Sequence, residues 1–370
     1  MASTLAHRRT LRAALSLVPI AALAACSLTS TDDPAAPPST SASAGASSST
    51  PGTVTLVTHD SFALADGLLE DFTASTGITV EVVQPGDAGT LVNQLVLTKD
   101  APLGDAVFGI DNAFASRALD EGVLAPYTSA APAAGDAATH ALPGDDEGAL
   151  TAVDYGDVCL NVDHAWFDEH DVPEPETLDD LLDPQYEDLL VVPNPVTSSP
   201  GFAFLLTTVA ASSDGWQDYW QGLVDNGLKV ADGWSDAYFT DFSGGGGDGP
   251  RPIVLSYASS PPSTVPEGGT EPTTGALLGT CFRQVEYAGV LANAQNPSGA
   301  QQLIDFLLSD AVQADIPGSM YMYPVSTAVE LPQEWQQWAP LAEQPFEVAP
   351  DEIAAERDTW LEQWSDTVIG

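Results

Sequence analysis

The chain has 370 residues, enough for a short leading segment and two domains. It holds 9 Lys and Arg residues against 53 Asp and Glu residues, which gives a formal net charge of −44 at pH 7. This balance excludes nucleic acid as a partner, because a polyanion is bound by a basic surface that so few cations cannot build. The acidity is typical of a strongly solvated surface, and it would also draw a cationic ligand toward a cleft.

The first 25 residues predict a secretory signal peptide. Residues 1–12 are basic, residues 13–22 are apolar, and Leu23-Ala24-Ala25-Cys26 follows. A basic start, a short apolar run and small residues before the cut are the layout of such a signal, and the run is too short to span a membrane stably. The string L-A-A-C resembles the bacterial lipoprotein box, in which the cysteine receives a lipid. We therefore expect lipidation at Cys26; an ordinary signal peptide that happens to hold a cysteine is the alternative.

A flexible tether is predicted at residues 26–53. These residues are almost all Ser, Thr, Ala, Pro, Gly and Asp, with little apolar surface to bury, so ordering them would cost more than packing returns. The lipid and the tether would hold the remaining residues, 54–370, at the outer face of the cytoplasmic membrane.

Strands and helices alternate from the start of this body. β-branched residues predict strands at 54–58, 78–83 and 106–110, while apolar residues at helical spacing predict helices at 63–73, 89–99 and 114–121, with Gly77 ending the first helix. Such alternation is typical of a mostly parallel sheet covered by helices, so the fold class is α/β.

A second block of the same kind begins near residue 153. Strands are predicted at 159–162, 189–192, 253–257 and 283–287, and helices at 178–182, 202–211, 219–224, 299–308 and 351–368. In the last helix Trp360 and Trp364 are spaced to face the core. The glycine-rich stretch 244–249 lacks the lysine and the following helix of a phosphate-binding loop, and we interpret it as a mobile tip.

Cys159 and Cys281 are the only cysteines besides Cys26. In an exported protein two cysteines pair in one way, so a disulfide is predicted between them. Their spacing fits no zinc site, and no metal centre is expected.

Five segments, taken in order, carry the functional signal: T-H-D-S-F at 58–62, F-G-I-D-N at 108–112, T-S-S-P-G at 197–201, G-W-S-D-A-Y at 233–238 with L-S-Y-A-S-S-P at 255–261, and I-P-G-S-M-Y-M-Y-P-V at 316–325. Their number, order and spacing resemble the thiamine-binding receptors of bacterial ABC importers. The resemblance extends from residue 54 to about residue 365.

This resemblance implies a type II periplasmic-binding-protein clamshell with mixed sheets and a ligand cleft between two lobes. The first lobe would comprise 54–154 and 284–322, and the second 155–283 and 323–370, with chain crossings near 154–157, 284–287 and 321–325. The partners implied are thiamine or its phosphate esters, an ABC permease and the ATPase that drives it. The protein would be a monomer that needs no cofactor and catalyses no reaction.

Thiamine joins an aminopyrimidine to a cationic thiazolium, so its site needs aromatic walls and a nearby acid. By match to the family's motifs the walls are Trp234, Tyr257 and Tyr321. Asp60 and Asp111 follow strand ends, where α/β sheets bind ligands, although capping the next helix is an equal alternative. His59 and Ser61 belong to the first motif.

A phosphate tail would have its own site at the start of the predicted helix 202–211. Ser198, Ser199 and Gly201 open this helix, and free N–H groups there bind anions without a basic side chain; a plain helix cap is the alternative. The chain departs from the family's pattern at His59, Tyr321 and Ser263, which replace an aromatic residue, a tryptophan and a tyrosine.

Two other functions compete with this interpretation. Ferric-ion receptors of the same superfamily usually bind the metal through adjacent tyrosines, whereas Tyr257 has no tyrosine beside it, and Tyr321 and Tyr323 are spaced as alternate residues that share a face. Thiaminase-like enzymes share the clamshell but attack with a cysteine, for which only Cys159 or Cys281 could serve. No hydrolase signature is present, so we expect no enzyme.

Overall fold

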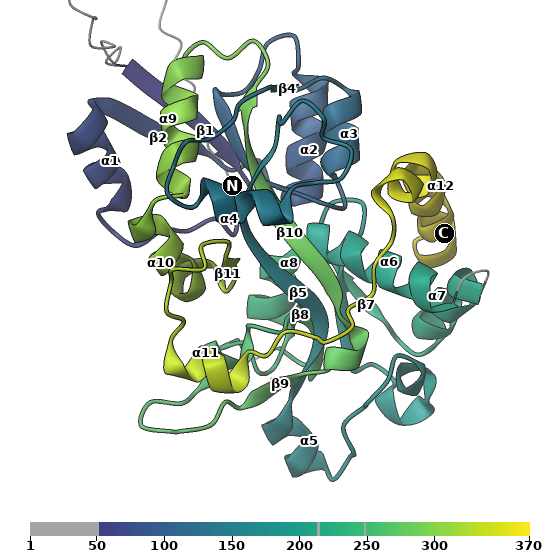
Figure 1. The fold of residues 1–370 in the computed structure, drawn as a ribbon. Coiled ribbons are helices and arrows are strands. Elements are labelled where there is room, and N and C mark those ends of the chain that lie inside the picture. The colour runs from purple at the N-terminus through teal and green to yellow at the C-terminus, as the bar shows by residue number, and fades with distance from the viewer. Residues whose placement is uncertain (1–51, 213–214, 248) are drawn as a thin grey trace, which may run out of the picture. The chain divides into compact units, whose positions relative to one another are not determined.

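The computed structural model describes residues 52–212, 215–247 and 249–370 (Figure 1). The predicted signal peptide, Cys26 and all but the last two residues of the predicted tether lie outside these ranges. The strands are β1 (Gly52–Thr58), β2 (Ile78–Val83), β3 (Ala106–Asp111), β4 (Leu124–Ala125), β5 (Thr151–Asp163), β6 (Leu190–Pro193), β7 (Lys229–Ala231), β8 (Ile253–Tyr257), β9 (Thr274–Ala276), β10 (Phe282–Leu291) and β11 (Tyr323–Pro324).

The α-helices vary from single turns to five turns in length. They are α1 (Leu68–Thr76), α2 (Ala88–Leu97), α3 (Ala115–Asp120), α4 (Ala134–Ala137), α5 (His164–His170), α6 (Ser199–Ser212), α7 (Trp216–Asp225), α8 (Trp234–Asp236), α9 (Pro297–Leu307), α10 (Asp310–Met320), α11 (Gln333–Trp338) and α12 (Pro350–Val368). In the part of the chain that the structure describes, no helix is both long enough and apolar enough to cross a membrane.

The strands form one mixed sheet in the order β2-β1-β3-β10-β5-β8-β6-β7, with β4 paired to β10 and with β9 and β11 paired to β5. We call β2, β1 and β3 with α1, α2, α3 and α9 the first lobe, and β8, β6 and β7 with α6, α7 and α8 the second lobe (Figure 1). Within each lobe the strands pair in parallel, as predicted: β1 with β2 and β3, and β6 with β7 and β8. In the middle of the sheet the neighbouring strands β3, β10, β5 and β8 pair antiparallel. The sheet is mixed rather than mostly parallel because the chain traverses its middle in opposite directions.

The long strands β5 and β10 run side by side between the two lobes (Figure 1). Their antiparallel register pairs Arg283 with Asp157 and Glu286 with Asp154, and β11 joins β5 where Tyr323 pairs with Tyr155. The three segments in which the sequence predicts chain crossings are therefore hydrogen-bonded neighbours.

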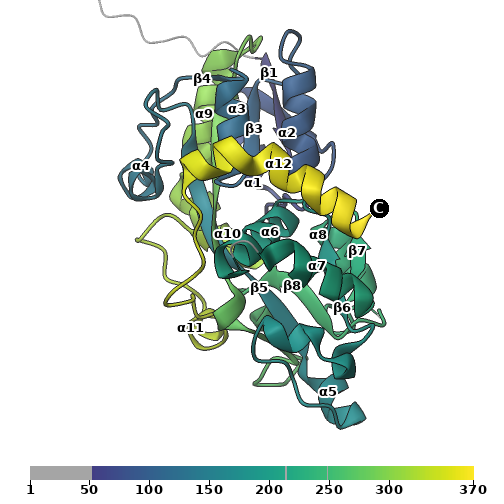
Figure 2. The ribbon, with the colours of Figure 1, turned by 90° about the vertical axis from the view of Figure 1, so that its right-hand side faces the viewer.

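The C-terminal helix α12 packs against both lobes, touching α3 and α7 (Figure 2). Its Arg357 guanidinium lies 4.9 Å from the centre of the Phe114 ring in the first lobe and 5.8 Å from that of Phe202 in the second. Trp360 and Trp364 are buried, as predicted, and Trp364 meets Trp220 edge to face at 5.6 Å between ring centres.

Most predicted elements are present, and the differences have local causes. The helix expected at 63–73 begins only at Leu68, because Gly67 adopts a left-handed φ of 97° and the Ala65 N–H donates to the Asp315 carboxylate at 2.8 Å. It ends at Thr76, and the N–H of the following Gly77 donates to the Thr73 carbonyl oxygen, so Gly77 ends the helix as expected. The helix predicted at 178–182 is a 3₁₀ turn at Asp179–Leu182.

The glycine-rich stretch 244–249 packs closely against the π-helical turn Ala237–Asp241 in its described part. A Cβ atom on Gly245 would lie 2.3 Å from the Tyr238 carbonyl oxygen, and one on Gly249 would lie 2.1 Å from that of Asp241. Glycine is required here by close backbone approach.

Candidate functional site

A cavity of about 290 Å³ lies between the lobes, near the lower end of the range for small-molecule sites, roughly 300 to 1,000 Å³. Segments far apart in the sequence meet around it: the residues after β1 and β2, the starts of α6 and α8, the end of β8, the middle of β10 and the end of α10. Its lining consists of His59, Asp60, Ser61, Phe62, Ala63, Asp87, Ala88, Ser199, Pro200, Trp234, Ser235, Phe239, Tyr257, Glu286, Ser319, Met320, Tyr321 and Met322.

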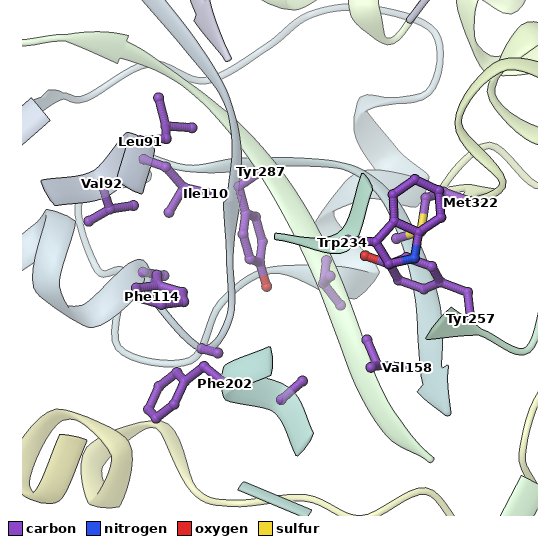
Figure 3. Packing of buried hydrophobic residues seen from close by; sticks show 14 of the residues in the cluster. Leu91, Val92, Ile110, Phe114, Val158, Phe202, Trp234, Tyr257, Tyr287 and Met322 are labelled. Carbon is purple, nitrogen blue, oxygen red and sulfur yellow. The ribbon is translucent and has the colours of Figure 1, made fainter. Parts of the chain in front are cut away.

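Trp234 forms the centre of an aromatic wall. Its ring stacks on Tyr238 at 5.1 Å between centres and meets Tyr257 at 6.0 Å and Tyr321 at 6.5 Å edge to face. Figure 3 shows Trp234, Tyr257 and Met322 grouped together. Trp234 is buried, with 7% of the residue exposed, and its indole Nε1 donates to the Ser256 hydroxyl at 2.9 Å, so a directional bond fixes the ring in addition to packing.

The lining is acidic and holds no Lys or Arg. Burial raises the pKa of the Asp60 carboxyl, and the charge of Asp87 raises it further. Burial alone would also raise the pKa of Glu286, but His59 and hydrogen bonds from neighbouring side chains outweigh it and hold that pKa below its ordinary value. Asp154, the register partner of Glu286, has a pKa raised well above its ordinary value by burial and by the charge of Glu286. The cavity is therefore suited to a cationic or amine-bearing ligand.

His59 contributes the one imidazole of the lining. Its ring lies over Gly109, where a Cβ atom would come within 2.1 Å of the imidazole Cδ2, and Gly109 also has a left-handed φ of 92°. The Nε2 atom is 3.8 Å from Glu286 Oε1. Burial alone would lower the pKa of His59, but the charge and hydrogen-bonding capacity of Glu286, with Asp87 and Asp60, raise it above its ordinary value.

Asp111 lies behind the cavity wall and is fully buried. Its carboxylate accepts hydrogen bonds from the Ser199 hydroxyl and from the backbone N–H groups of Ala113 at 3.1 Å and Phe114 at 2.9 Å. Burial raises its pKa to about 7, against the effect of these bonds. Asp111 thus binds the N–H groups of the turn that leads into α3, not those of the helix itself, and it meets the cavity lining through Ser199.

The first N–H groups of α6 already have partners in the protein. The Ser199 N–H donates to Asp87 Oδ1 at 3.3 Å and the Gly201 N–H to the Ser198 hydroxyl at 3.4 Å, while Pro200 has no N–H to offer. A Cβ atom on Gly201 would lie 2.5 Å from the Pro193 carbonyl oxygen, so this glycine serves helix packing. Of the three predicted residues at this helix start, only Ser199 lines the cavity.

The cavity brings together seven of the ten residues predicted to contact a ligand, and the remaining three are buried and do not line it. The lining ones are His59, Asp60, Ser61, Ser199, Trp234, Tyr257 and Tyr321; the others are Asp111, Ser198 and Gly201.

Sequence reasoning missed Asp87, Glu286 and Phe239. Asp87 follows the end of β2 in a P-G-D turn before a helix, and this position was a usable signal. The position of Glu286 at the cavity depends on the pairing of β10 with β5, which the sequence does not reveal. The position of Phe239 depends on the π-helical turn, which leaves this residue 48% exposed.

Tyr321 and Tyr323 do not share a face, so that expectation was wrong. Tyr321 ends α10 with a left-handed φ of 57°, which turns the chain before β11 begins. Tyr321 therefore lines the cavity, while Tyr323 stacks on Tyr155 at 5.6 Å and packs against Trp335. Among residues 52–212, 215–247 and 249–370, no group of three or more His, Cys, Asp or Glu side chains is arranged to hold a metal ion.

Cys159 and Cys281 are joined as a disulfide in the structure, with 4.3 Å between their Cα atoms. Both are buried, one on β5 and the other just before β10. Neither sulfur is therefore available as a free nucleophile in this state.

Comparison with known proteins agrees with this architecture. The family model described as bacterial extracellular solute-binding protein matches residues 105–343, more than half of the chain. The thiamine-binding periplasmic protein of Escherichia coli is 29% identical over 322 residues, covering 85% of this chain and 93% of the relative. A solved structure described as a periplasmic thiamin binding protein is 28% identical, with a TM-score of 0.74 over 85% of this chain and 96% of its own.

Iron-bound HitA from Pseudomonas aeruginosa is 20% identical, with a TM-score of 0.62 over 86% of this chain and 99% of its own, and this likeness shows the fold alone. The Escherichia coli relative and the thiamin-related structure are both described as binding proteins. The two-lobed mixed α/β architecture is that of the periplasmic binding proteins. With the family model matched over most of the body, the chain belongs to the bacterial extracellular solute-binding proteins.

Proposed function

We propose that this protein is the lipid-anchored receptor of an ABC importer and that it binds thiamine in the cavity between its lobes. The observation that carries the proposal is the combination of an aromatic wall at Trp234 with an acidic lining free of Lys and Arg. A thiazolium cation is stabilised by π-faces and carboxylates together, at about 1 to 2 kcal/mol for each desolvated cation–π contact. The thiamine-binding names of relatives at 28% to 29% identity support the same ligand.

Thiamine itself is favoured over its phosphate esters. An ester tail brings negative charge into a lining that already holds Asp60, Asp87 and Glu286. The helix start that would receive such a tail has its first N–H groups engaged by Asp87 and Ser198. An anion bound there would have to break these hydrogen bonds, and the free energy lost in breaking them would weaken its binding.

The proposal includes delivery of the bound ligand to a membrane transporter, as solute-binding receptors of ABC importers do. In this proposal the lobes divide as 54–154 with 284–322 and 155–283 with 323–370, and they close on the ligand about the adjacent strands β5 and β10. A permease with its ATPase then accepts the ligand from the closed receptor, which works outside the cytoplasm as a monomer. The lipid on Cys26 and the tether keep the receptor beside the permease.

Calorimetry of the purified protein with thiamine, its monophosphate, its diphosphate and ferric iron tests the proposal. We expect thiamine to bind with a dissociation constant between about 1 μM and 1 nM, roughly −8 to −12 kcal/mol. Trp234→Ala should weaken binding by about 1 to 3 kcal/mol through loss of the stacked face. The matched control is Trp166→Ala, which removes an indole on α5 that stacks on His170 away from the cavity.

Two results would count against thiamine as the ligand. Absence of heat and of thermal stabilisation with all three vitamers would reject the proposal outright. A coloured complex on addition of ferric iron would instead favour a metal receptor, in which the tyrosines of the lining would be the ligands.

A further inference from the structure

The start of α2, in the first lobe, docks directly onto the second lobe. Oδ1 of Asp87 accepts the backbone N–H of Ala88 at 2.6 Å, which caps α2, and that of Ser199 at 3.3 Å. Oδ2 of Asp87 accepts the backbone N–H of Trp234 at 2.9 Å. One carboxylate therefore joins three helix starts: α2 of the first lobe, and α6 and α8 of the second.

Backbone packing beside this carboxylate is equally close. The Thr90 N–H donates to the Thr197 carbonyl oxygen at 3.0 Å, and a Cβ atom on Gly89 would lie only 2.7 Å from the Thr197 carbonyl carbon. Gly233, which precedes Trp234, leaves room for the carboxylate in the same way, since a Cβ atom there would lie 3.1 Å from Asp87 Oδ2. The two lobes thus meet at a seam formed by residues 87–90 on one side and by 197–199 and 233–234 on the other.

Asp87 is well suited to hold this seam. An ionised carboxylate accepts hydrogen bonds only, and the groups that face it across the seam are backbone donors at helix starts, where unpaired N–H groups attract negative charge. Its side chain is 9% exposed, so water competes little for these bonds. Because one of the donors is the backbone of Trp234, the bond fixes the indole wall relative to the first lobe.

We propose that Asp87 is a positioning residue that locks the second lobe onto the first and thereby holds the Trp234 indole and the start of α6 in their ligand-receiving geometry. The inference rests on the proposed solute-binding function but not on thiamine being the solute. A lock of this kind acts on the closed state, so its loss should speed ligand escape more than it slows ligand entry.

Asp87→Asn and Asp87→Ser are the variants that separate the lock from the helix cap. Asn and Ser both cap helices, so α2 should remain folded, but Asn presents only one acceptor oxygen and Ser is too short to reach across the seam. With thiamine as probe, stopped-flow fluorescence should give dissociation at least about tenfold faster than in the wild type, with a smaller change in the association rate. Asp163→Asn is the control, because it replaces a carboxylate that caps α5 through the Ala165 and Trp166 N–H groups and does not line the cavity.

Closure can also be measured without any solute. The Ser61 and Ser235 hydroxyl oxygens lie 3.2 Å apart across the cavity mouth, so a Ser61→Cys, Ser235→Cys pair should form a disulfide under mild oxidant only when the lobes close. In this background Asp87→Asn should slow cross-linking about tenfold, while Asp163→Asn should leave the rate unchanged.

Gly233→Ala perturbs the same lock from the opposite lobe. Its φ of −155° suits alanine, so the added methyl group acts only by crowding the Asp87 carboxylate. It should speed dissociation and slow cross-linking, and adding it to Asp87→Asn should have little further effect, as expected for two changes in one interaction.

The outcomes distinguish this inference from the proposed function. If the wild type binds none of the vitamers, the proposed ligand fails, and the cross-linking comparison still decides the role of Asp87. If folded Asp87→Asn cross-links as fast as the wild type, or releases thiamine at the wild-type rate, the lock is rejected. Should Asp87→Asn fail to fold, Gly233→Ala decides the question by the same two measurements.

Discussion

The charge state of His59 depends on the acids around it. It is buried beside Glu286, and the charges of Glu286, Asp87 and Asp60 raise its pKa above the ordinary value of 6.5 despite its burial. A histidine with a raised pKa stabilises the fold most below its unfolded pKa, and this contribution is lost as the pH rises through the folded pKa.

We therefore expect the stability lost on His59→Gln to depend on pH. The difference in unfolding free energy between wild type and variant should be largest near pH 5.5 and should shrink toward pH 8.5, as measured by denaturant unfolding across this range. Comparison with the variant cancels most of the contribution of the other acids. His170→Gln on α5 is the control. If the stability difference between wild type and His59→Gln grew as the pH rose, the pKa of His59 would not be raised in the folded protein.

For single residues, the sequence predicts a place at the cavity when the residue follows the end of a strand and belongs to a motif that matches the family. Asp60, Trp234 and Tyr257 could be placed at the cavity because their motifs match the family and their strands end there. Glu286 could not, since its side chain reaches the cavity only through the pairing of β10 with β3 and β5. A long-range strand register is a tertiary property that no local pattern encodes.

Strands β5 and β10 are the elements that connect the two lobes within the sheet. The disulfide joins Cys159 of β5 to Cys281, just before β10, at a sequence separation of 122, and Arg283 of β10 forms a two-pronged ion pair with Asp157 of β5. Closing so long a loop should stabilise the protein by about 3 to 5 kcal/mol in the chain-entropy model.

Thiol titration tests whether this bond forms. Denatured, unreduced protein carrying Cys26→Ala, so that only these two cysteines remain, should show no free thiol. Replacing both with serine should lower the free energy of unfolding by about 3 to 5 kcal/mol, measured in urea. Two titratable thiols would contradict the pairing and would return a cysteine nucleophile to consideration.

Element prediction succeeded where burial and backbone preference agree. The strands at 106–110 and 253–257 are short β-branched and apolar runs whose residues are buried throughout, and they appear as β3 and β8. The helix at 63–73 was misplaced at its start because Leu64 fits the helical spacing while Gly67 takes a left-handed turn. That turn is held by Asp315 from α10, 250 residues further along the chain.

For the whole molecule, the most consequential prediction is the anchor at Cys26, which lies outside the described residues. Cys26→Ala should release the protein from the membrane fraction, as judged by fractionation and immunoblotting. Uptake should fall at scarce thiamine while the affinity of the purified protein stays unchanged, because the lipid supplies a high local concentration and makes no contact with the ligand. Ser27→Ala, next to the lipidation site, is the control and should remain attached. Equal membrane retention of Cys26→Ala would show that another feature holds the protein there.

The fixed register of β5 and β10 also limits the kind of motion available to the lobes. Backbone pairing runs from Phe282 opposite Val158 to Ala288 opposite Thr151, and the disulfide closes one end of this ladder. Sliding one strand along the other would break every bond of the ladder, whereas bending both together breaks none. We therefore expect the lobes to open by bending of the β5–β10 pair rather than by sliding of one strand along the other, so that this pair acts as a hinge.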